Sequence, residues 1–406
     1  MGSPTETPSL LDRELRQHDA ATQAPPLRLG VVGLGAVAQA VHLPLLARHP
    51  DLFRTVALCD LSRSTCDTVG GRLGVPAERR FGSAEELLAA GGLDAIAILT
   101  SGSHAELAAA AARAGLAIFC EKPLAYTLAD ADALAAADPR LLLGYMKLYD
   151  PAVERARTLL EGRPPARSVE VTVLHPPSPA QLLHAGLLPP ATDVDAATLE
   201  LLRGAERAAA ERALGPVPAE LADLYTDVLL GSIVHDLAVI RHLLGGPLAF
   251  DHADAWPEAV PSSVALEGQL SGETRVSVRW HYLESYPGYR EEVRVHDERG
   301  TVELAFPSPY LLNAPTVLTV LDGDDGAERA AAFRSTAEAF ERQWLSFASL
   351  ALEGRPPRAG IAEGREDIVA CQGAAAALAE RRGLELAGEA ARLLDNRRPH
   401  QREGPK

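Results

Sequence analysis

Between residues 27 and 150, short uninterrupted apolar runs alternate with alanine-rich stretches in which apolar side chains recur at helical spacing. Runs without polar alternation are typical of strands that are buried on both faces. The apolar runs occupy residues 27–33, 55–60, 94–100, 116–122 and 141–146. The helical stretches occupy residues 42–50, 66–73, 84–91 and 104–115, and they end at or beside Gly or Pro. This strand–helix repetition predicts a parallel, doubly wound α/β sheet.

The pattern changes after Asp150, where we place the boundary between a first domain, 27–150, and a second domain, 151–395. Residues 175–226 hold two proline clusters and a strongly helical stretch. We interpret them as a helical insertion that either caps the mouth of a binding site or decorates the surface. The other elements of the second domain are predicted at residues 152–160, 167–174, 221–244, 247–334, 338–354 and 365–383.

Within residues 247–334, apolar and polar side chains alternate, and turn signals separate the runs. Such alternation is typical of an antiparallel sheet that packs against helices with one face only. The flanking stretches at 221–244, 338–354 and 365–383 have helical spacing. The second domain is therefore also expected to combine helices with a sheet.

Composition excludes several classes of function. The 406 residues are 47% hydrophobic, and 55 acidic against 39 basic side chains give a net charge of −16. A field of this sign repels polyphosphates, which argues against a nucleic-acid or anionic-membrane surface. We find no signal peptide and no apolar run of membrane-spanning length, and we expect residues 1–26 and 396–406 to be flexible tails. Four cysteines without metal-site spacing favour a reducing, cytoplasmic setting.

The first candidate site is a glycine motif that follows the first predicted strand and leads into a helix. Gly33 permits a tight turn, Gly35 lets the backbone approach a pyrophosphate, and Ala38 allows the helix to pack closely on the strand. The residues predicted to bind a dinucleotide here are Gly33, Gly35, Ala36, Val37 and Ala38.

Asp60 ends the second predicted strand and extends this site. A carboxylate at this position binds the ribose hydroxyls of an adenosine and repels a 2′-phosphate, so Asp60 favours NAD. Arg63 follows closely, and its guanidinium could hold that phosphate instead. The predicted cofactor is therefore NAD(P), with a lean towards NAD.

The second candidate site is the turn Glu121-Lys122-Pro123, which follows another apolar run. Ligands of open parallel sheets bind at the carboxyl ends of the strands. A lysine there can donate a hydrogen bond to a substrate oxygen and help to manage a proton during hydride transfer. The alternative interpretation is an ordinary charged surface turn.

At this point the sequence resembles a known family. Residues 27–46, 94–125, 143–151 and 352–372 are similar to the Gfo/Idh/MocA family of glucose–fructose oxidoreductases and inositol dehydrogenases. The resemblance implies an N-terminal Rossmann domain and a C-terminal α/β domain with a large, mostly antiparallel sheet that often forms the dimer or tetramer interface. It also implies NAD(P)-dependent oxidation or reduction of a sugar, a polyol or a related carbonyl compound.

The resemblance also assigns roles to residues. Lys122 becomes the catalytic or substrate-orienting lysine, and Glu121 and Pro123 shape the loop at the nicotinamide. The residues that the resemblance places along the cofactor are Thr100, Ser101, Ser103 and His104.

The third candidate site is a polar stripe of Ser232, His235 and Asp236 on the predicted helix at 221–244. Their i, i+3 and i+4 spacing puts them on one face of a helix. A lone histidine on such an apolar helix is more often a core residue. Members of the resembled family carry a D-x-x-x-H pair here, whose histidine exchanges a proton with the reacting hydroxyl, and His235 matches that histidine.

The aspartate of the pair has no match, because Gly231 stands four residues before His235. Asp236 is a candidate electrostatic substitute. Asp227 is too far for direct contact, at ~12 Å along the axis for ~1.5 Å per residue. Room above Gly231 suggests a bulkier or differently oriented substrate.

Two further residues, Lys147 and Tyr149, occupy the stretch where relatives have polar substrate contacts, and we predict that they contact substrate. Lys147 is expected at a strand end, where a plain surface lysine is the equal alternative. The histidines and cysteines show no ligand spacing, so no metal is expected.

The sequence thus predicts an NAD(P)-dependent oxidoreductase that moves a hydride to or from a sugar-like or cyclic secondary alcohol or ketone, in either direction. Lys122 polarises the substrate oxygen and His235 relays the proton. Two alternatives stay open: an enzyme for a non-sugar metabolite such as an imine or a ring alcohol, and a catalytically silent NAD(P)-binding regulatory protein. The expected partners are a small-molecule substrate and further copies of the chain, in a homodimer or homotetramer, without nucleic acid or membrane.

Overall fold

The structure is a computed structural model that describes residues 25–257, 261–270, 273–324 and 326–393. Most of the predicted N-terminal tail and the whole predicted C-terminal tail lie outside the described residues. No helix in the described ranges is long and apolar enough to cross a membrane. All four cysteines are buried and free, and none forms a disulfide.

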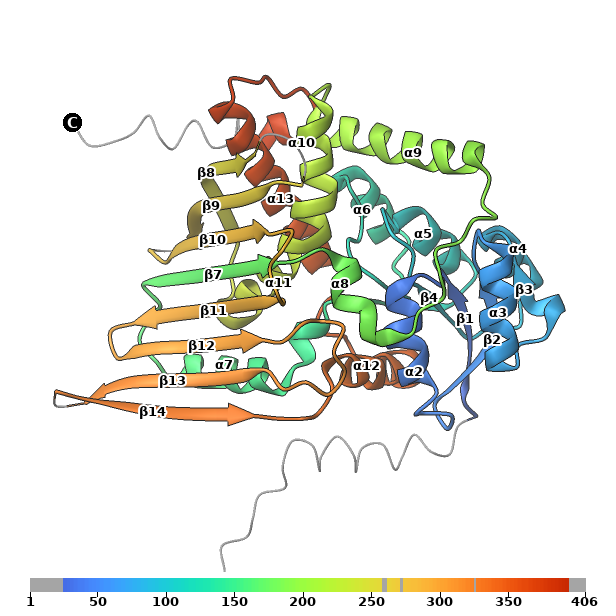
Figure 1. Cartoon of the computed structure of the whole chain (residues 1–406), viewed down its shortest axis with the longest axis horizontal. Helices are drawn as coiled ribbons and strands as arrows, with labels where there is room; N and C mark the ends of the chain where they lie inside the picture. The colour runs from blue at the N-terminus through green and yellow to red at the C-terminus, as the bar shows by residue number, and fades with distance from the viewer. Residues whose placement is uncertain (1–24, 258–260, 271–272, 325, 394–406) are drawn as a thin grey trace, which may run out of the picture.

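In the first half of the described chain, six strands form a parallel sheet in the order β3–β2–β1–β4–β5–β6 (Figure 1). This order, which reverses between β1 and β4, is that of the Rossmann fold. The strands are β1 (Leu27–Val32), β2 (Phe53–Cys59), β3 (Arg80–Phe81), β4 (Ala95–Ile98), β5 (Ala117–Cys120) and β6 (Leu141–Leu143). The doubly wound prediction is confirmed, and only β3 lacked a prediction, because two residues are too short to show a pattern.

Helices connect these strands on both faces of the parallel sheet. They are η1 (a π-helix, Ala38–His42), α2 (Leu43–Leu46), α3 (Arg63–Leu73), η2 (Ala77–Arg79), α4 (Ala84–Ala90), α5 (Ala105–Arg113) and α6 (Leu128–Ala135). Helix α3 shows why the local sequence starts and stops them: the Ser62 side chain accepts the N–H of Thr65, and Gly74 ends the helix in a left-handed conformation.

The remaining strands of the described chain form an eight-stranded mixed sheet in the order β14–β13–β12–β11–β7–β10–β9–β8. Only β7 and β10 pair in parallel, so the sheet is mostly antiparallel, as expected. The strands are β7 (Ser168–His175), β8 (Leu248–Trp256), β9 (Ser263–Leu270), β10 (Arg275–Tyr282), β11 (Arg290–Asp297), β12 (Gly300–Phe306), β13 (Val317–Asp324) and β14 (Ala327–Arg334).

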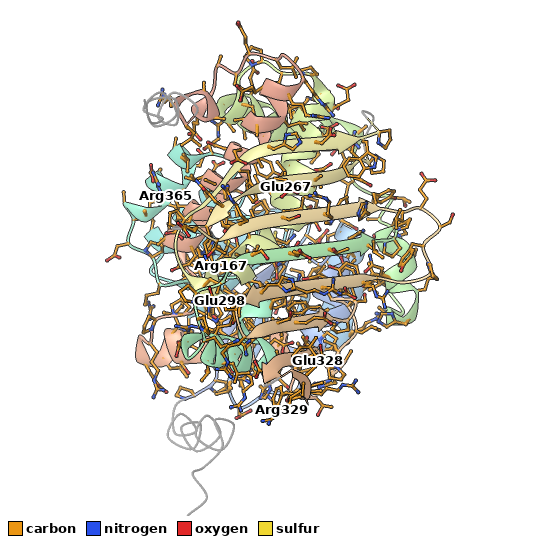
Figure 2. The ribbon with its side chains drawn as sticks, turned by 90° about the vertical axis from the view of Figure 1, so that its left-hand side faces the viewer. Arg167, Glu267, Glu298, Glu328, Arg329 and Arg365 are labelled. Atoms are coloured by element: carbon orange, nitrogen blue, oxygen red, sulfur yellow. The ribbon has the colours of Figure 1, made fainter. Side chains whose placement is uncertain are left out.

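One face of the mixed sheet is covered by helices. In β10, for example, Val276, Val278 and Trp280 are buried while the residues between them are partly exposed. Helices α7 (Pro151–Glu161), α11 (Val234–Leu244) and α13 (Ile361–Arg381) lie beside this sheet (Figure 1), while η3 (Met146–Tyr149) packs on α12 (Ala339–Glu353), which contacts β5 and β6 of the parallel sheet. Figure 2 looks onto the sheet and shows charged side chains such as Glu267 on it.

The division of the chain at Asp150 stays a prediction.

The predicted helix at 221–244 is not a single α-helix. It consists of α10 (Ala219–Asp223), a π-helical segment η5 (Leu224–Ile233) and α11. The α-helical spacing used for the polar stripe therefore crosses a change of helix type between Ser232 and His235. The other helices of the insertion are α8 (Ser178–Leu182), η4 (Leu183–Ala185) and α9 (Ala196–Leu214).

Helix α12 brings the end of the chain back to the parallel sheet. The fully buried Trp344 stacks on Phe119 of β5 at 4.1 Å between ring centroids, with an interplanar angle of 12°. Phe53 of β2 and Phe347 pack on the edges of the same ring. One aromatic cluster therefore joins β2, β5 and α12.

We predict that Trp344→Ala lowers the free energy of unfolding by about 3–5 kcal/mol, because it removes the centre of this cluster. The matched control is Trp256→Ala, since the Trp256 side chain is 42% exposed and should cost under about 1 kcal/mol. Urea unfolding, monitored by circular dichroism, measures the free energy of unfolding of both variants and of the wild type. Equal losses would contradict the assignment of this cluster to the core.

Candidate active site

The glycine motif forms the tight turn that the sequence predicted. Gly33 has φ +91°, and a Cβ added there would lie 2.7 Å from the backbone nitrogen of Thr100. Only glycine combines this conformation with so close an approach to the loop after β4. Gly35 is exposed, and a Cβ there would meet nothing within 4 Å, so the surface of the loop is open. Ala38 is buried under the loop, as close packing of the helix requires.

Asp60 closes this loop from the carboxyl end of β2. Its carboxylate accepts hydrogen bonds from the backbone N–H of Leu34 and of Ser62, both at 2.8 Å. The carboxylate is thereby held beside the glycine turn. Arg63 points elsewhere: its guanidinium donates to Asp67 at 3.1 Å and to the carbonyl of Arg80 at 2.9 Å.

The loop after β4 contains the four residues that were expected along the cofactor. Thr100 is partly buried, and Ser101 and Ser103 are exposed. His104 is buried, and its ring nitrogens lie 2.6 Å from the carbonyl oxygen of Pro123 and 2.9 Å from that of Thr100. The His104 ring therefore connects the loops after β4 and β5, and the place of these four residues along the cofactor stays a prediction.

Lys122 follows β5 and reaches the helix that carries His235. Its Nζ donates a hydrogen bond to the backbone carbonyl of Gly231 at 2.5 Å. Burial lowers the pKa of Lys122; the nearby carboxylate of Glu121 opposes this shift and the ammonium group of Lys147 adds to it. The turn is therefore not an ordinary charged surface turn.

Glu121 is held by a residue that the sequence did not single out. Its Oε1 lies 3.1 Å from Nε2 of the fully buried His42. Trp344 donates its indole N–H to Nδ1 of His42 at 3.2 Å, so Nε2 of His42 carries a proton and donates to Glu121. Burial raises the pKa of Glu121, but the His42 bond and the Lys122 charge outweigh it and lower that pKa overall. A carboxylate is thus fixed beside Lys122.

His235 lies in the first turn of α11, one helical turn after Gly231. Its Nδ1 is buried and has no hydrogen-bond partner among the described residues. Burial, together with the charges of Lys122 and Lys147, lowers the pKa of His235 well below its usual value. The imidazole is therefore neutral at neutral pH, which leaves it able to accept a proton.

Beside His235 lies a buried group of charges centred on Lys147. Its Nζ contacts both carboxylate oxygens of Glu291, at 2.5 and 2.6 Å, and Oδ1 of Asp236 at 3.8 Å. The Tyr289 hydroxyl donates to the same Glu291 at 2.6 Å. Burial, followed by the neighbouring carboxylate of Glu291, raises the pKa of Asp236 well above its usual value. Lys147 is thus neither at a strand end nor on the surface, but in the short helix η3 and ion-paired.

The structure brings Ser232 to this group but not Tyr149. Ser232 Oγ accepts the indole N–H of Trp280 at 2.9 Å, and the Trp280 ring lies 5.2 Å from that of His175. The Tyr149 hydroxyl instead accepts the N–H of Arg358 at 3.2 Å, and the Arg358 guanidinium lies over its ring at 4.9 Å. The polar atom of Tyr149 is thus directed to Arg358, and its contact with substrate stays a prediction.

A Cβ at Gly231 would lie 3.2 Å from the carbonyl oxygen of Thr226 and would meet no other residue within 4 Å. Room for a bulkier substrate above Gly231 stays a prediction. Asp227 accepts a hydrogen bond from the hydroxyl of Thr226 at 3.1 Å, and its separation from His235 stays a prediction. No group of metal-ligating side chains occurs among the described residues.

Sequence reasoning missed several residues of the site. Glu291 falls in phase with the buried Val293 and Val295 of β11, so a carboxylate at an inward position was a usable signal. His42 lies in an apolar helical stretch, where nothing distinguishes it from a core histidine. His175, Trp280 and Tyr289 come together only through the pairing of β7, β10 and β11.

Comparison with known proteins gives a family match and distant structural neighbours. Residues 27–141 match the Gfo/Idh/MocA model, described as an oxidoreductase family with an NAD-binding Rossmann fold. The inositol 2-dehydrogenase of Acidiphilium cryptum is 33% identical over 147 residues, which are 34% of this chain and 43% of that protein. Inositol 2-dehydrogenase 3 of Saccharopolyspora erythraea is 32% identical over 141 residues, 33% of this chain and 40% of that protein. The chain thus spans less than half the length of these curated relatives.

Two solved structures share the fold over most of both chains. The scyllo-inositol dehydrogenase of Lactobacillus casei with bound NAD(H) and scyllo-inositol has a TM-score of 0.62 at 17% identity, covering 88% of this chain and 98% of that one. A 3-ketoreductase from Actinomadura kijaniata in complex with NADP has a TM-score of 0.64 at 19% identity, covering 89% and 98%.

The lowered pKa of His235 predicts a pH-dependent stability. Below about pH 6.5 the unfolded chain binds a proton at this residue and the folded chain does not, so protonation favours unfolding. The stability of the wild type should therefore fall between pH 7 and pH 5 more steeply than that of His235→Asn, by up to about 1.4 kcal/mol per pH unit. Urea unfolding at each pH measures both slopes. Equal slopes would show that the imidazole titrates normally.

Proposed function

Because residues 27–141 match the Gfo/Idh/MocA oxidoreductase family, we propose that the chain is an NAD(P)-dependent oxidoreductase of a sugar-like or cyclic secondary alcohol or ketone. The observation that carries the proposal is the convergence of Lys122 and His235. Lys122 comes from the edge of the parallel sheet where ligands bind, and its Nζ contacts Gly231, one turn before His235. A proton donor and a proton acceptor are thereby brought to one place.

The residues at the glycine turn fit a dinucleotide. The open surface at Gly35, the positive φ of Gly33 and the start of a helix directly afterwards form the cradle that a pyrophosphate needs. Asp60 is held where it can accept a ribose hydroxyl. Bound NAD(P) would supply the acceptor or donor of the hydride.

The chain's own residues would manage the substrate oxygen and its proton. Lys122 has three N–H donors, of which Gly231 uses one, so the others are available for the substrate oxygen. The neutral imidazole of His235 accepts the hydroxyl proton during oxidation and returns it during reduction. The carboxylate of Glu121, which His42 holds, favours the charged form of Lys122.

A hydroxyl-rich substrate is supported by buried polar atoms that lack a hydrogen-bond partner among the described residues. Nδ1 of His175, Nδ1 of His235 and Oδ1 of Asp236 are buried, and no described residue hydrogen-bonds to them. Buried polar atoms normally have partners, so these positions favour a ligand with several hydroxyl groups. Ser232 and Asp236 are the proposed substrate contacts, while Lys147 is occupied by Glu291 and balances charge beside them. The inositol dehydrogenases among the relatives agree with such a substrate class.

Two further predictions are untested. Assembly into a homodimer or homotetramer through the mixed sheet and a cytoplasmic location both stay predictions.

Lys122→Ala tests the proposal. We expect kcat/KM to fall at least about 100-fold, because the donor to the substrate oxygen is lost, while NAD(P)H affinity stays nearly unchanged. Inositols and ketosugars are assayed through NAD(P)H absorbance, and NADH and NADPH binding is measured by fluorescence titration. Activity equal to the wild type would refute the role of Lys122. Dinucleotide binding by the wild type without turnover of any alcohol or carbonyl compound would favour a regulatory protein.

A further inference from the structure

The insertion does more than decorate the surface. Between η4 and α9, residues 186–195 form a segment that we call the strap, and it runs beside the parallel sheet (Figure 1). At its start, the N–H of Leu188 donates to Oε1 of Gln39, in the helix directly after the glycine turn, at 3.2 Å. At its end, Asp193 reaches the loop after β2. The strap therefore connects the two loops that the proposed dinucleotide would contact.

Asp193 makes two short hydrogen bonds at the start of α3. Its carboxylate accepts the hydroxyl of Ser62 at 2.6 Å and the backbone N–H of Ser64 at 2.8 Å. These bonds lower the pKa of Asp193 to about 2, so it is a carboxylate at any physiological pH. Ser62 also donates its own N–H to Asp60. Two carboxylates, Asp60 and Asp193, therefore share one serine.

The helix that follows the strap holds it in place. In α9, Oε1 of Glu206 lies so close to Gly102 that a Cβ there would stand 2.7 Å from it. In the last turn of α9, Arg212 donates to Asp130 of α6 at 2.7 Å. The strap is thus fixed between contacts to the loops after β1, β2 and β4.

We propose that Asp193 determines cofactor specificity, making the chain select NAD(H) and reject NADP(H). This proposal depends on the dinucleotide binding proposed above. The 2′-phosphate of NADP is attached to the ribose that the acidic residue after β2 binds, which here is Asp60. Two nearby donors that could receive that phosphate are the hydroxyl of Ser62 and the N–H of Ser64, and Asp193 already occupies both.

The charges around this place also act against a phosphate. A 2′-phosphate would come close to the carboxylates of both Asp60 and Asp193. All three groups are negatively charged, so they would repel one another. Arg63, the side chain expected to hold the phosphate, is bound to Asp67 and to the carbonyl of Arg80. A 2′-hydroxyl meets neither obstacle, because it is neutral and can donate to Asp60.

Fluorescence titration of the full-length protein with NADH and with NADPH tests the proposal directly. The wild type should bind NADH at least about 100-fold more tightly than NADPH. Asp193→Asn should tighten NADPH binding at least about tenfold and change NADH binding less than about threefold, because it removes the charge and keeps the shape. Asp193→Ser should shift the ratio of the NADPH and NADH affinities in the same direction. This second variant guards against an effect peculiar to asparagine.

The matched control is Asp195→Asn, two residues along. Asp195 is also an exposed carboxylate at a helix start, but it accepts from the first turn of its own helix, at Thr198, and not from the loop after β2, so both affinities should stay unchanged. Thermal unfolding of each variant shows that the fold is retained.

The outcomes separate the two proposals. Equal binding of NADH and NADPH by the wild type, or an unchanged ratio in both Asp193 variants with NADH binding retained, would overturn the role of Asp193 alone. Binding of neither dinucleotide by the wild type would overturn the proposed function and this inference with it. A wild-type preference for NADH that weakens as salt is raised would support the electrostatic cause.

Discussion

Lys122 donates a hydrogen bond over 2.5 Å to the backbone carbonyl of Gly231, and the two residues lie 109 positions apart in the sequence. This contact joins the carboxyl end of β5 to the helix that carries His235. The Tyr225 hydroxyl, which donates to the carbonyl of Tyr126 at 2.6 Å, joins the same two parts of the chain. The stacking of Trp344 on Phe119 also fixes the position of β5, because it holds α12 against this strand.

A second constraint is that the charges in this region are matched across elements. Glu121 stands beside Lys122 and is held by His42, while Glu291 of β11 pairs with Lys147 of η3. The ammonium groups of Lys122 and Lys147 act on His235, and burial together with their positive charge keeps its imidazole neutral. Buried charges are tolerated only when they are paired, so these acids are as necessary as the bases that they accompany.

The sequence predicted the parallel sheet well, because long apolar runs and glycine turns are local signals. It also singled out Lys122 and His235, through motif and resemblance, and the structure brings Lys122 to Gly231, one helical turn before His235. It could not identify His42, which looks like a core histidine, and it placed Tyr149 at the site although the hydroxyl of Tyr149 turns to Arg358. The path of the strap depends on contacts 129 and 131 residues apart, between Asp193 and the loop after β2, and no local pattern records such pairings.

The central claim is that Lys122 and His235 act on one substrate oxygen. A crystal structure of the protein with a dinucleotide and a bound inositol or ketosugar tests it most directly. The account predicts one ligand oxygen within hydrogen-bond distance of both Lys122 Nζ and a ring nitrogen of His235, with a ribose hydroxyl on Asp60. A ligand bound away from these two side chains, or one that contacts only one of them, would contradict the account.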